Sequence, residues 1–110
     1  MKEENDVVIV SAVRTPFGRF DGVLKTVLSM DLGVLALKEA VRRINLDPRH
    51  VNEVYYGTCI PAEYAIYTNV PARQITLLAG FPENNISLTI DRACCSSMTA
   101  LRLGYRAIKS

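Results

Sequence analysis

Three cysteines, Cys59, Cys94 and Cys95, are the side chains of this 110-residue chain with the most reactive chemistry. An odd number of cysteines in a chain that is not rich in them does not predict a disulfide framework. Zinc binding is not predicted either, because Cys94 and Cys95 are adjacent and His50 is the only histidine. We therefore expect free thiols. One could be a nucleophile, and all could simply pack in the interior, which is the commoner role of cysteine.

Cys94 stands where a predicted strand gives way to a predicted helix. The strand covers 86–90, and the helix is expected to begin at Cys94 or Cys95 and to run toward Lys109. A helix N-terminus offers unpaired N–H groups and partial positive charge, which favour a thiolate and can hold the oxyanion of a tetrahedral intermediate. Arg92 adds positive charge nearby. This position is typical of a nucleophile in acyl transfer. Cys95 is expected to serve packing, and Cys59 is expected to be a loop or core thiol.

The remaining elements alternate between strands and helices. We expect strands at 7–10, 51–57 and 86–90, and helices at 29–44, from Pro71 to Gly80, and from 94 or 95 to 109. The order β-α-β-α-β-α predicts an α/β fold with a mostly parallel sheet. Ligand sites in such sheets lie beyond the carboxyl ends of the strands, and Cys94 follows the carboxyl end of the third.

Two segments are expected to be well buried. Val7–Val10 is a continuous β-branched run, which suits a strand covered on both faces. The last helix is apolar almost all round, which is typical of a buried helix rather than an amphipathic one. Phe20 and Phe81 are expected in the core.

Charge and composition exclude several classes of protein. The net charge is +2, from 13 Lys and Arg against 11 Asp and Glu, so no basic surface for nucleic acid is predicted. No apolar run approaches the roughly 18 residues of a membrane span. The first six residues carry acids and are not followed by the apolar core of a signal peptide. We therefore expect a cytoplasmic protein with no membrane or nucleic-acid partner.

Three segments resemble the thiolase family. Residues 91–100 (Asp-Arg-Ala-Cys-Cys-Ser-Ser-Met-Thr-Ala) resemble its nucleophile segment, usually Asn-Lys-Val-Cys-Ala/Gly-Ser-Gly-Met/Leu-Lys-Ala. Residues 8–18 look like the opening strand and its Arg-Thr-Pro-x-Gly turn. Residues 69–74 resemble the Asn-Pro-Ala-Arg-Gln segment that starts the preceding helix. The three occur in the family's order across nearly the whole chain, which therefore resembles the N-terminal segment of a thiolase.

This resemblance implies an acyl-CoA acyltransferase. Cys94 would attack an acyl-CoA thioester to form an acyl-enzyme, and deprotonated acetyl-CoA would then attack the acyl group. The product would be a 3-ketoacyl-CoA such as acetoacetyl-CoA, and the reverse reaction is thiolysis. Coenzyme A thioesters would be the substrates, with no metal or prosthetic group. Met98 would line the acyl pocket, although Met beside a helix start is more often core. Family members are homodimers or homotetramers built from duplicated βαβαβαββ halves.

Two arginines also have expected places. Arg14 would reach either a phosphate of coenzyme A or a neighbouring loop. Arg73 falls in the first turns of a helix, where its charge opposes the helix dipole. A structural role or a subunit contact is therefore expected for Arg73.

The chain departs from the thiolase pattern at several points. Asp91 replaces the usual Asn, Ser97 replaces a Gly, and 61–63 (Pro-Ala-Glu) replaces Gln-Ala-Gly. The Gly-His-Pro segment of the general base and the late Cys-x-Gly segment are missing, and His50 is expected at the opposite edge of the sheet. Residues 1–110 are thus interpreted as a partial thiolase N-terminal domain. The alternative is a truncated, non-catalytic fragment of a thiolase-fold protein, or of a related ketoacyl synthase, that needs a partner or the missing half.

Overall fold

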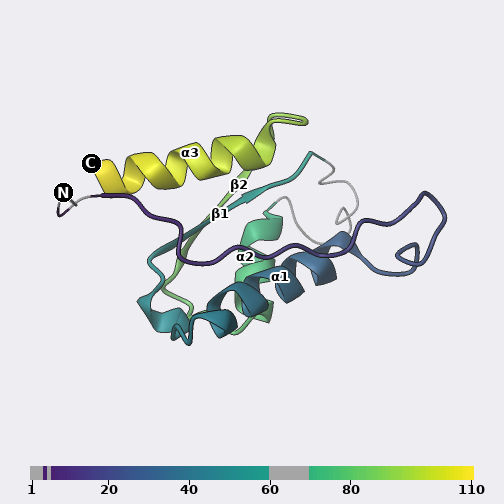
Figure 1. The fold of residues 1–110 in the computed structure, drawn as a ribbon, viewed down its shortest axis with the longest axis horizontal. Coiled ribbons are helices and arrows are strands. Elements are labelled where there is room, and N and C mark those ends of the chain that lie inside the picture. Colours follow the sequence, from purple (N-terminus) through teal and green to yellow (C-terminus); the bar gives the residue numbers. More distant parts are fainter. Residues whose placement is uncertain (1–3, 5, 60–69) are drawn as a thin grey trace.

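A small parallel sheet with helices on both faces forms the body of the chain. The structure is a computed structural model that describes residue 4 and residues 6–59 and 70–110. The elements are α1 (Ser29–Arg43), the short 3-10 helix η1 (Pro48–His50), β1 (Glu53–Gly57), α2 (Pro71–Leu78), β2 (Ile86–Ile90) and α3 (Ser96–Lys109). In Figure 1, α3 lies on one face of the strands, and α2 and α1 lie on the other. The predicted α/β class is confirmed.

The two strands pair in parallel, with Glu53 opposite Ile86 and Gly57 opposite Ile90. Asn85, just before β2, is buried and donates from Nδ2 to the carbonyl of Val51, 2.7 Å away. This bond joins the amino ends of the two strands. Their carboxyl ends therefore meet at the opposite edge, where the chain continues from β2 into α3.

Single residues explain where α1 ends and where α2 begins. Asn45 takes a left-handed conformation, with φ +51°, directly after the C-cap of α1. Asn tolerates this region better than most residues, so it ends the helix as predicted. Pro71 occupies the first turn of α2, where a missing N–H costs nothing. The next N–H, of Ala72, donates to Thr89 Oγ1 of β2 at 3.0 Å, which fastens the start of α2 to the sheet.

Arg73 has the structural role expected for it. Its guanidinium donates to the carbonyls of Asn85 at 3.0 Å and Glu83 at 2.6 Å. These two carbonyls lie in the loop that leads into β2. Arg73 therefore ties α2 to the loop that leads into β2, although its charge opposes the dipole of its own helix.

The buried core lies between α2, β2 and α3. Its apolar members are Ala72, Ile75, Ala79, Phe81, Ile90 and Ala100. The prediction that Phe81 is buried is confirmed. The prediction for Phe20 is wrong, because its side chain is 99% exposed. Figure 1 shows the reason, since the segment before α1 loops away from the body of the molecule.

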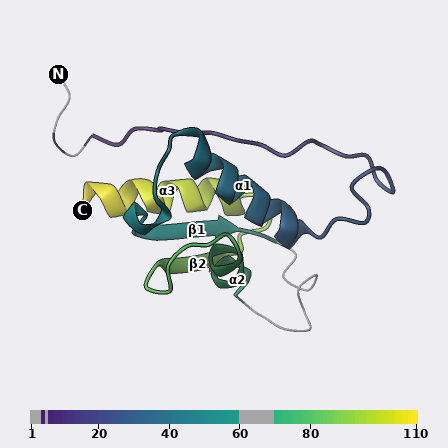
Figure 2. The ribbon, with the colours of Figure 1, turned by 90° about the horizontal axis from the view of Figure 1, so that it is seen from below.

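The predicted strand at Val7–Val10 is not formed. This segment is extended but is not paired with either described strand, and Ile9 is 77% exposed. Figure 2 shows the extended N-terminal segment running past α3 and α1 without joining the sheet. A β-branched run supplies the propensity for a strand, but a strand also needs a hydrogen-bonded neighbour. Val7–Val10 has no such neighbour among the described residues.

The prediction that the last helix is buried is also wrong. Within α3 only Ser96 and Ala100 are buried, and this face packs against β1. Met98 is 70% exposed, and Leu101, Tyr105 and Ile108 are also exposed. An all-round apolar helix needs cover on both sides, and the described chain covers one. No described helix is both long and apolar enough to cross a membrane.

Some of the expectations concern positions outside the described residues. These are Asn69, the expected cap of the second helix, and the departure from the family pattern at 61–63.

Candidate functional site

A tight turn joins β2 to α3 and carries Cys94. The strand ends at Ile90 and the helix begins at Ser96, as the sequence predicts to within two residues. Ala93 has a φ of +50°, a left-handed conformation that reverses the chain directly before Cys94. The N–H of Ala93 donates to Asp91 Oδ1 at 3.0 Å. Asp91, which replaces the family's Asn, thus acts as the side-chain acceptor of the turn, a role that an Asn oxygen fills equally well.

Ser96 closes the turn from the helix side. Its Oγ accepts the N–H of Arg92 at 2.8 Å and donates to the carbonyl of Ala93 at 2.7 Å. The Ser96 residue is 4% exposed. One buried hydroxyl therefore satisfies a backbone group of Arg92 and one of Ala93, and Cys94 lies between these residues and Ser96.

Removing this hydroxyl is expected to loosen the turn. Ser96→Ala removes both hydrogen bonds of the hydroxyl, and the part-buried bond from the Arg92 N–H alone is worth about 0.5–1.5 kcal/mol. Chemical denaturation would measure the loss in the free energy of unfolding. Ser97→Ala is the matched control, since Ser97 is exposed, and it is expected to change stability by less than about 0.5 kcal/mol. Equal effects of the two substitutions would contradict this role for Ser96.

Substitution of Ala93, in contrast, is expected to keep or raise the stability of the protein. A left-handed conformation costs an L-residue about 1–2 kcal/mol, and glycine avoids this cost at the expense of about 0.4–1 kcal/mol of unfolded-state entropy. Ala93→Gly is therefore expected to leave stability unchanged or to raise it by up to about 1 kcal/mol. Ala107→Gly, the same change inside α3, is expected to lower stability by about 0.5–1 kcal/mol. Denaturation midpoints of the two variants would contradict this account if Ala93→Gly were the more damaging.

Gly57 allows α3 to start close to the end of β1. A Cβ on Gly57 would lie 2.5 Å from the carbonyl carbon of Ser96 and 2.5 Å from the nitrogen of Ser97, both backbone atoms. Only glycine fits this approach, so it sets how near the Cys94 turn lies to the strand ends. The sequence analysis missed both Gly57 and Ser96. A glycine at the carboxyl end of a strand is the signal that would have indicated Gly57.

The fold brings only some of the predicted site residues close to one another. Cys59, Cys94 and Cys95 are all free and exposed, so the expectation that Cys95 serves packing is wrong for the described chain. Cys59 lies in the loop after β1, which is one of the two places expected for it. Cys95 and Met98 line one hollow of about 540 Å³ together with Arg92, and Cys94 does not line it. The Arg92 guanidinium contacts Thr99 Oγ1 at 3.3 Å, so it lies along α3.

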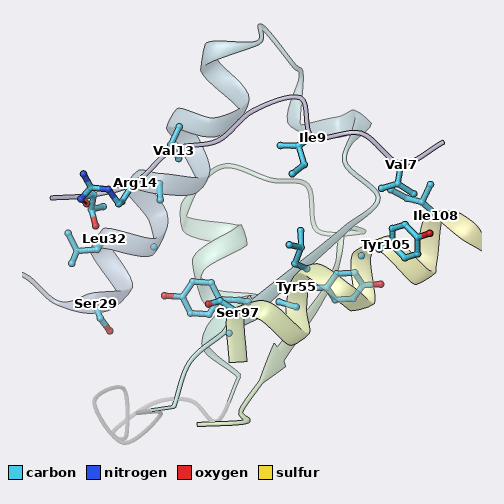
Figure 3. A pocket seen from close by; sticks show the side chains of 18 of the residues that line it. Val7, Ile9, Val13, Arg14, Ser29, Leu32, Tyr55, Ser97, Tyr105 and Ile108 are labelled. Atoms are coloured by element: carbon cyan, nitrogen blue, oxygen red, sulfur yellow. Dashed lines mark hydrogen bonds between the residues drawn. The ribbon is translucent and has the colours of Figure 1, made fainter. Parts of the chain in front are cut away.

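A larger apolar cleft lies on the inner side of α3. Its volume is about 970 Å³ and it opens between the extended segment that begins at Val7, helix α1, strand β1 and helix α3. Figure 3 shows Val7, Ile9 and Val13 across the cleft from Tyr55 and Tyr105. Cys94 does not line this cleft either, so the described part of the chain does not enclose its thiol.

Two other predicted residues lie away from Cys94. His50 is exposed in η1, before the amino end of β1, and Cys94 follows the carboxyl end of the parallel strand β2. The prediction that His50 lies at the opposite edge is therefore confirmed. Arg14 is stacked on Phe17, with its guanidinium carbon 4.6 Å from the ring centroid, so it contacts its own loop. Within the described residues no three His, Cys, Asp or Glu side chains are grouped to hold a metal ion.

A strand–turn–helix that exposes a cysteine, on a parallel α/β sheet, has a close match among solved structures. A thiolase from Ascaris suum, solved in complex with coenzyme A, superposes with a TM-score of 0.84 and 34% identity. The match covers 90% of this chain and 25% of that one. The fold and the cysteine turn together define a thiolase-type α/β domain.

The family assignment follows from the sequence match. The family model described as "Thiolase, N-terminal domain" matches residues 7–110, and the chain belongs to the thiolase family. A cytosolic acetyl-CoA acetyltransferase of Gibberella zeae is 40% identical over 102 residues, which are 93% of this chain and 25% of that protein. A mitochondrial acetyl-CoA acetyltransferase of Danio rerio is 38% identical over 104 residues, 94% of this chain and 24% of that protein. The chain spans about a quarter of the length of these relatives.

Proposed function

We propose that this chain supplies the nucleophile of a thiolase-type acyl transfer, with Cys94 as the acyl acceptor. The observation that carries the proposal is the exposed Cys94 thiol on the turn between β2 and α3, within the segment that matches the thiolase N-terminal domain. Helix α3 begins at Ser96 and directs the positive end of its dipole toward this turn. Positive potential there stabilises a thiolate and an oxyanion developing on a bound thioester.

The proposed reaction has two steps. Cys94 Sγ attacks the carbonyl carbon of acetyl-CoA, the new carbon–sulfur bond forms, and the thiolate of coenzyme A leaves. The methyl carbon of a second acetyl-CoA, after loss of a proton to a base, then attacks the acetyl group. This yields acetoacetyl-CoA and returns the Cys94 thiolate. The reverse sequence cleaves a 3-ketoacyl-CoA with coenzyme A.

The base for the second step does not come from His50, which lies at the other edge of the sheet. A positioned base contributes about 10²–10⁴-fold to such a step. We therefore propose that residues 1–110 are part of a thiolase N-terminal domain, and that turnover needs the base that the rest of a thiolase supplies. The length of the relatives, about four times that of the part matched here, supports this division.

The finer details of the proposal follow the same family. Met98 would contact the acyl group, as the Met or Leu at this position of the family pattern implies. The complete enzyme would be a homodimer or homotetramer. A cytosolic location is proposed, in line with the composition and with the Gibberella zeae relative. No nucleic-acid partner is proposed.

Thiolysis of acetoacetyl-CoA tests the proposed function. The chain would be assayed alone and after mixing with a polypeptide comprising the unmatched three quarters of the Ascaris suum thiolase. The loss of acetoacetyl-CoA absorbance is expected to accelerate only in the mixture. No turnover in a mixture that forms a stable complex would contradict the proposal.

A second candidate is a non-catalytic fragment that acts only by association. The exposed apolar side chains along one face of α3, among them Met98, Leu101 and Tyr105, favour it. Light scattering measures whether the isolated chain is a monomer or associates. A domain that is stable by itself would stay monomeric, which neither candidate predicts. Association at micromolar concentration is expected, because this face is left uncovered. A monomer that unfolds cooperatively would contradict the fragment candidate.

A further inference from the structure

Cys94 and Cys95 form a pair of adjacent thiols, and the second of them has no part in the acyl transfer proposed above. Both are free and exposed. In the family pattern, Ala or Gly follows the nucleophile, so the second thiol is a particular feature of this chain. Cys59, the third thiol, follows the carboxyl end of the other strand, β1.

We propose that Cys94 and Cys95 together form a dithiol site for monosubstituted trivalent arsenicals. In the binding step, an arsenical of the form R–As=O reacts with the two thiols. Two arsenic–sulfur bonds form, the arsenic–oxygen bond breaks, and the oxygen leaves as water with both thiol protons. Arsenic stays trivalent, so no oxidant or reductant is needed. The carbon substituent fills the third bond of arsenic, and two protein sulfurs are therefore sufficient.

The geometry of the turn favours a bridged pair over a disulfide. Adjacent Cα atoms are about 3.8 Å apart, whereas disulfides usually join Cα atoms at least about 4.4 Å apart. The backbone is also held on both sides, because Cys95 donates its N–H to the Arg92 carbonyl at 3.1 Å and accepts from the Thr99 N–H at 2.9 Å. An arsenic atom between the two sulfurs lengthens the span, because two arsenic–sulfur bonds take the place of one sulfur–sulfur bond.

A hollow beside Cys95 gives the organic substituent a place. Its volume is about 540 Å³, and apolar surface of Met98, Leu101 and Tyr105 forms much of its lining. An aromatic ring attached to arsenic on Cys95 would pack against the Met98 thioether, a contact that sulfur and aromatic groups favour. The site is therefore expected to prefer an aryl arsenical to a methyl arsenical.

Titration with phenylarsine oxide tests the proposal. One equivalent is expected to lower the number of titratable thiols in the native protein from three to one. Intact mass should show a single adduct. Excess glutathione, a monothiol, should not displace the arsenical, and dithiothreitol should. More than one tightly held arsenical, or displacement by glutathione, would overturn the proposal.

Single substitutions identify the two sulfurs. Cys95→Ser is expected to weaken retention against glutathione by about 10²-fold or more, because the second arsenic–sulfur bond forms within one complex. Cys94→Ser should have the same effect, and Cys59→Ser none. Circular dichroism of each variant checks folding. An unchanged Cys95→Ser or a weakened Cys59→Ser would contradict the pairing.

Two further measurements test the preference for an aryl substituent and separate arsenical binding from the proposed acyl transfer. Methylarsine oxide is expected to bind more weakly than phenylarsine oxide, and equal binding would overturn the role given to the hollow. Binding is measured by mass and thiol count, so it can succeed even where the acyl transfer fails. Only the inhibition expected on binding, through occupation of Cys94, rests on the proposed function.

Discussion

Cys94→Ser is expected to abolish formation of an acyl-enzyme and to lower thiolysis by a factor on the order of 10⁴ or more. The reason is chemical, because a thiolate attacks thioesters at neutral pH, whereas an unactivated serine hydroxyl does not. The described chain offers serine no base, since His50 lies at the other edge of the sheet. The measurement is the rate of acetoacetyl-CoA thiolysis by the complex with the unmatched part of a thiolase.

Cys59→Ser is the matched control for this prediction. Cys59 is also free and exposed, but it follows β1 rather than β2. Its substitution is expected to leave the rate within about twofold, as for a surface change away from the site. A loss in Cys59→Ser as large as that in Cys94→Ser would move the nucleophile to the end of the other strand.

Gly57→Ala is expected to have the largest structural effect of any single methyl group near the site. The added Cβ would lie 2.5 Å from backbone atoms of Ser96 and Ser97, which cannot turn aside as a side chain can. Overpacking of this kind costs about 1–3 kcal/mol, so α3 must shift away from β1. The free energy of unfolding should fall by this amount. The shift also moves the Cys94 turn, so the rate of acyl-enzyme formation should fall with it.

Gly104→Ala is the control for this effect, because it adds the same methyl group to the same interface. Its nearest neighbour would be the ring of Tyr55 at 3.6 Å, an ordinary contact. Alanine is also the better helix former by up to about 1 kcal/mol. Gly104→Ala is therefore expected to keep or raise stability. If the two variants unfold at the same denaturant concentration, the close approach at Gly57 does not position α3.

Sequence reasoning predicts the local elements well and their packing poorly. The bounds of α3 and β2 follow from a strand pattern, a turn and a helical pattern that are contiguous in the chain. The same reasoning fails for Val7–Val10, because pairing depends on which chain lies beside β1. It fails again for the outer face of α3, where apolar character predicts a need for cover and cannot show whether the cover is present.

The same difference between local features and long-range contacts applies to the candidate site. Cys94 and its position at the helix start follow from the motif, because the residues that define them are neighbours in sequence. Gly57 carries one local signal, its place at the carboxyl end of a strand, but its contact with Ser96 joins residues far apart in the chain and is visible only in the structure. The hydroxyl of Ser96 was missed for a different reason. Its two hydrogen bonds become visible only once the bend at Ala93 is known.

The most direct test of the central claim locates the acetyl group itself. The complex of this chain with the unmatched part of a thiolase would be mixed with acetyl-CoA, quenched in acid, digested and mapped by mass spectrometry. A single acetyl thioester on Cys94, released by added coenzyme A, is the result we predict. An acetyl group on Cys59 or Cys95, or none on this chain in a complex that turns over, would contradict it.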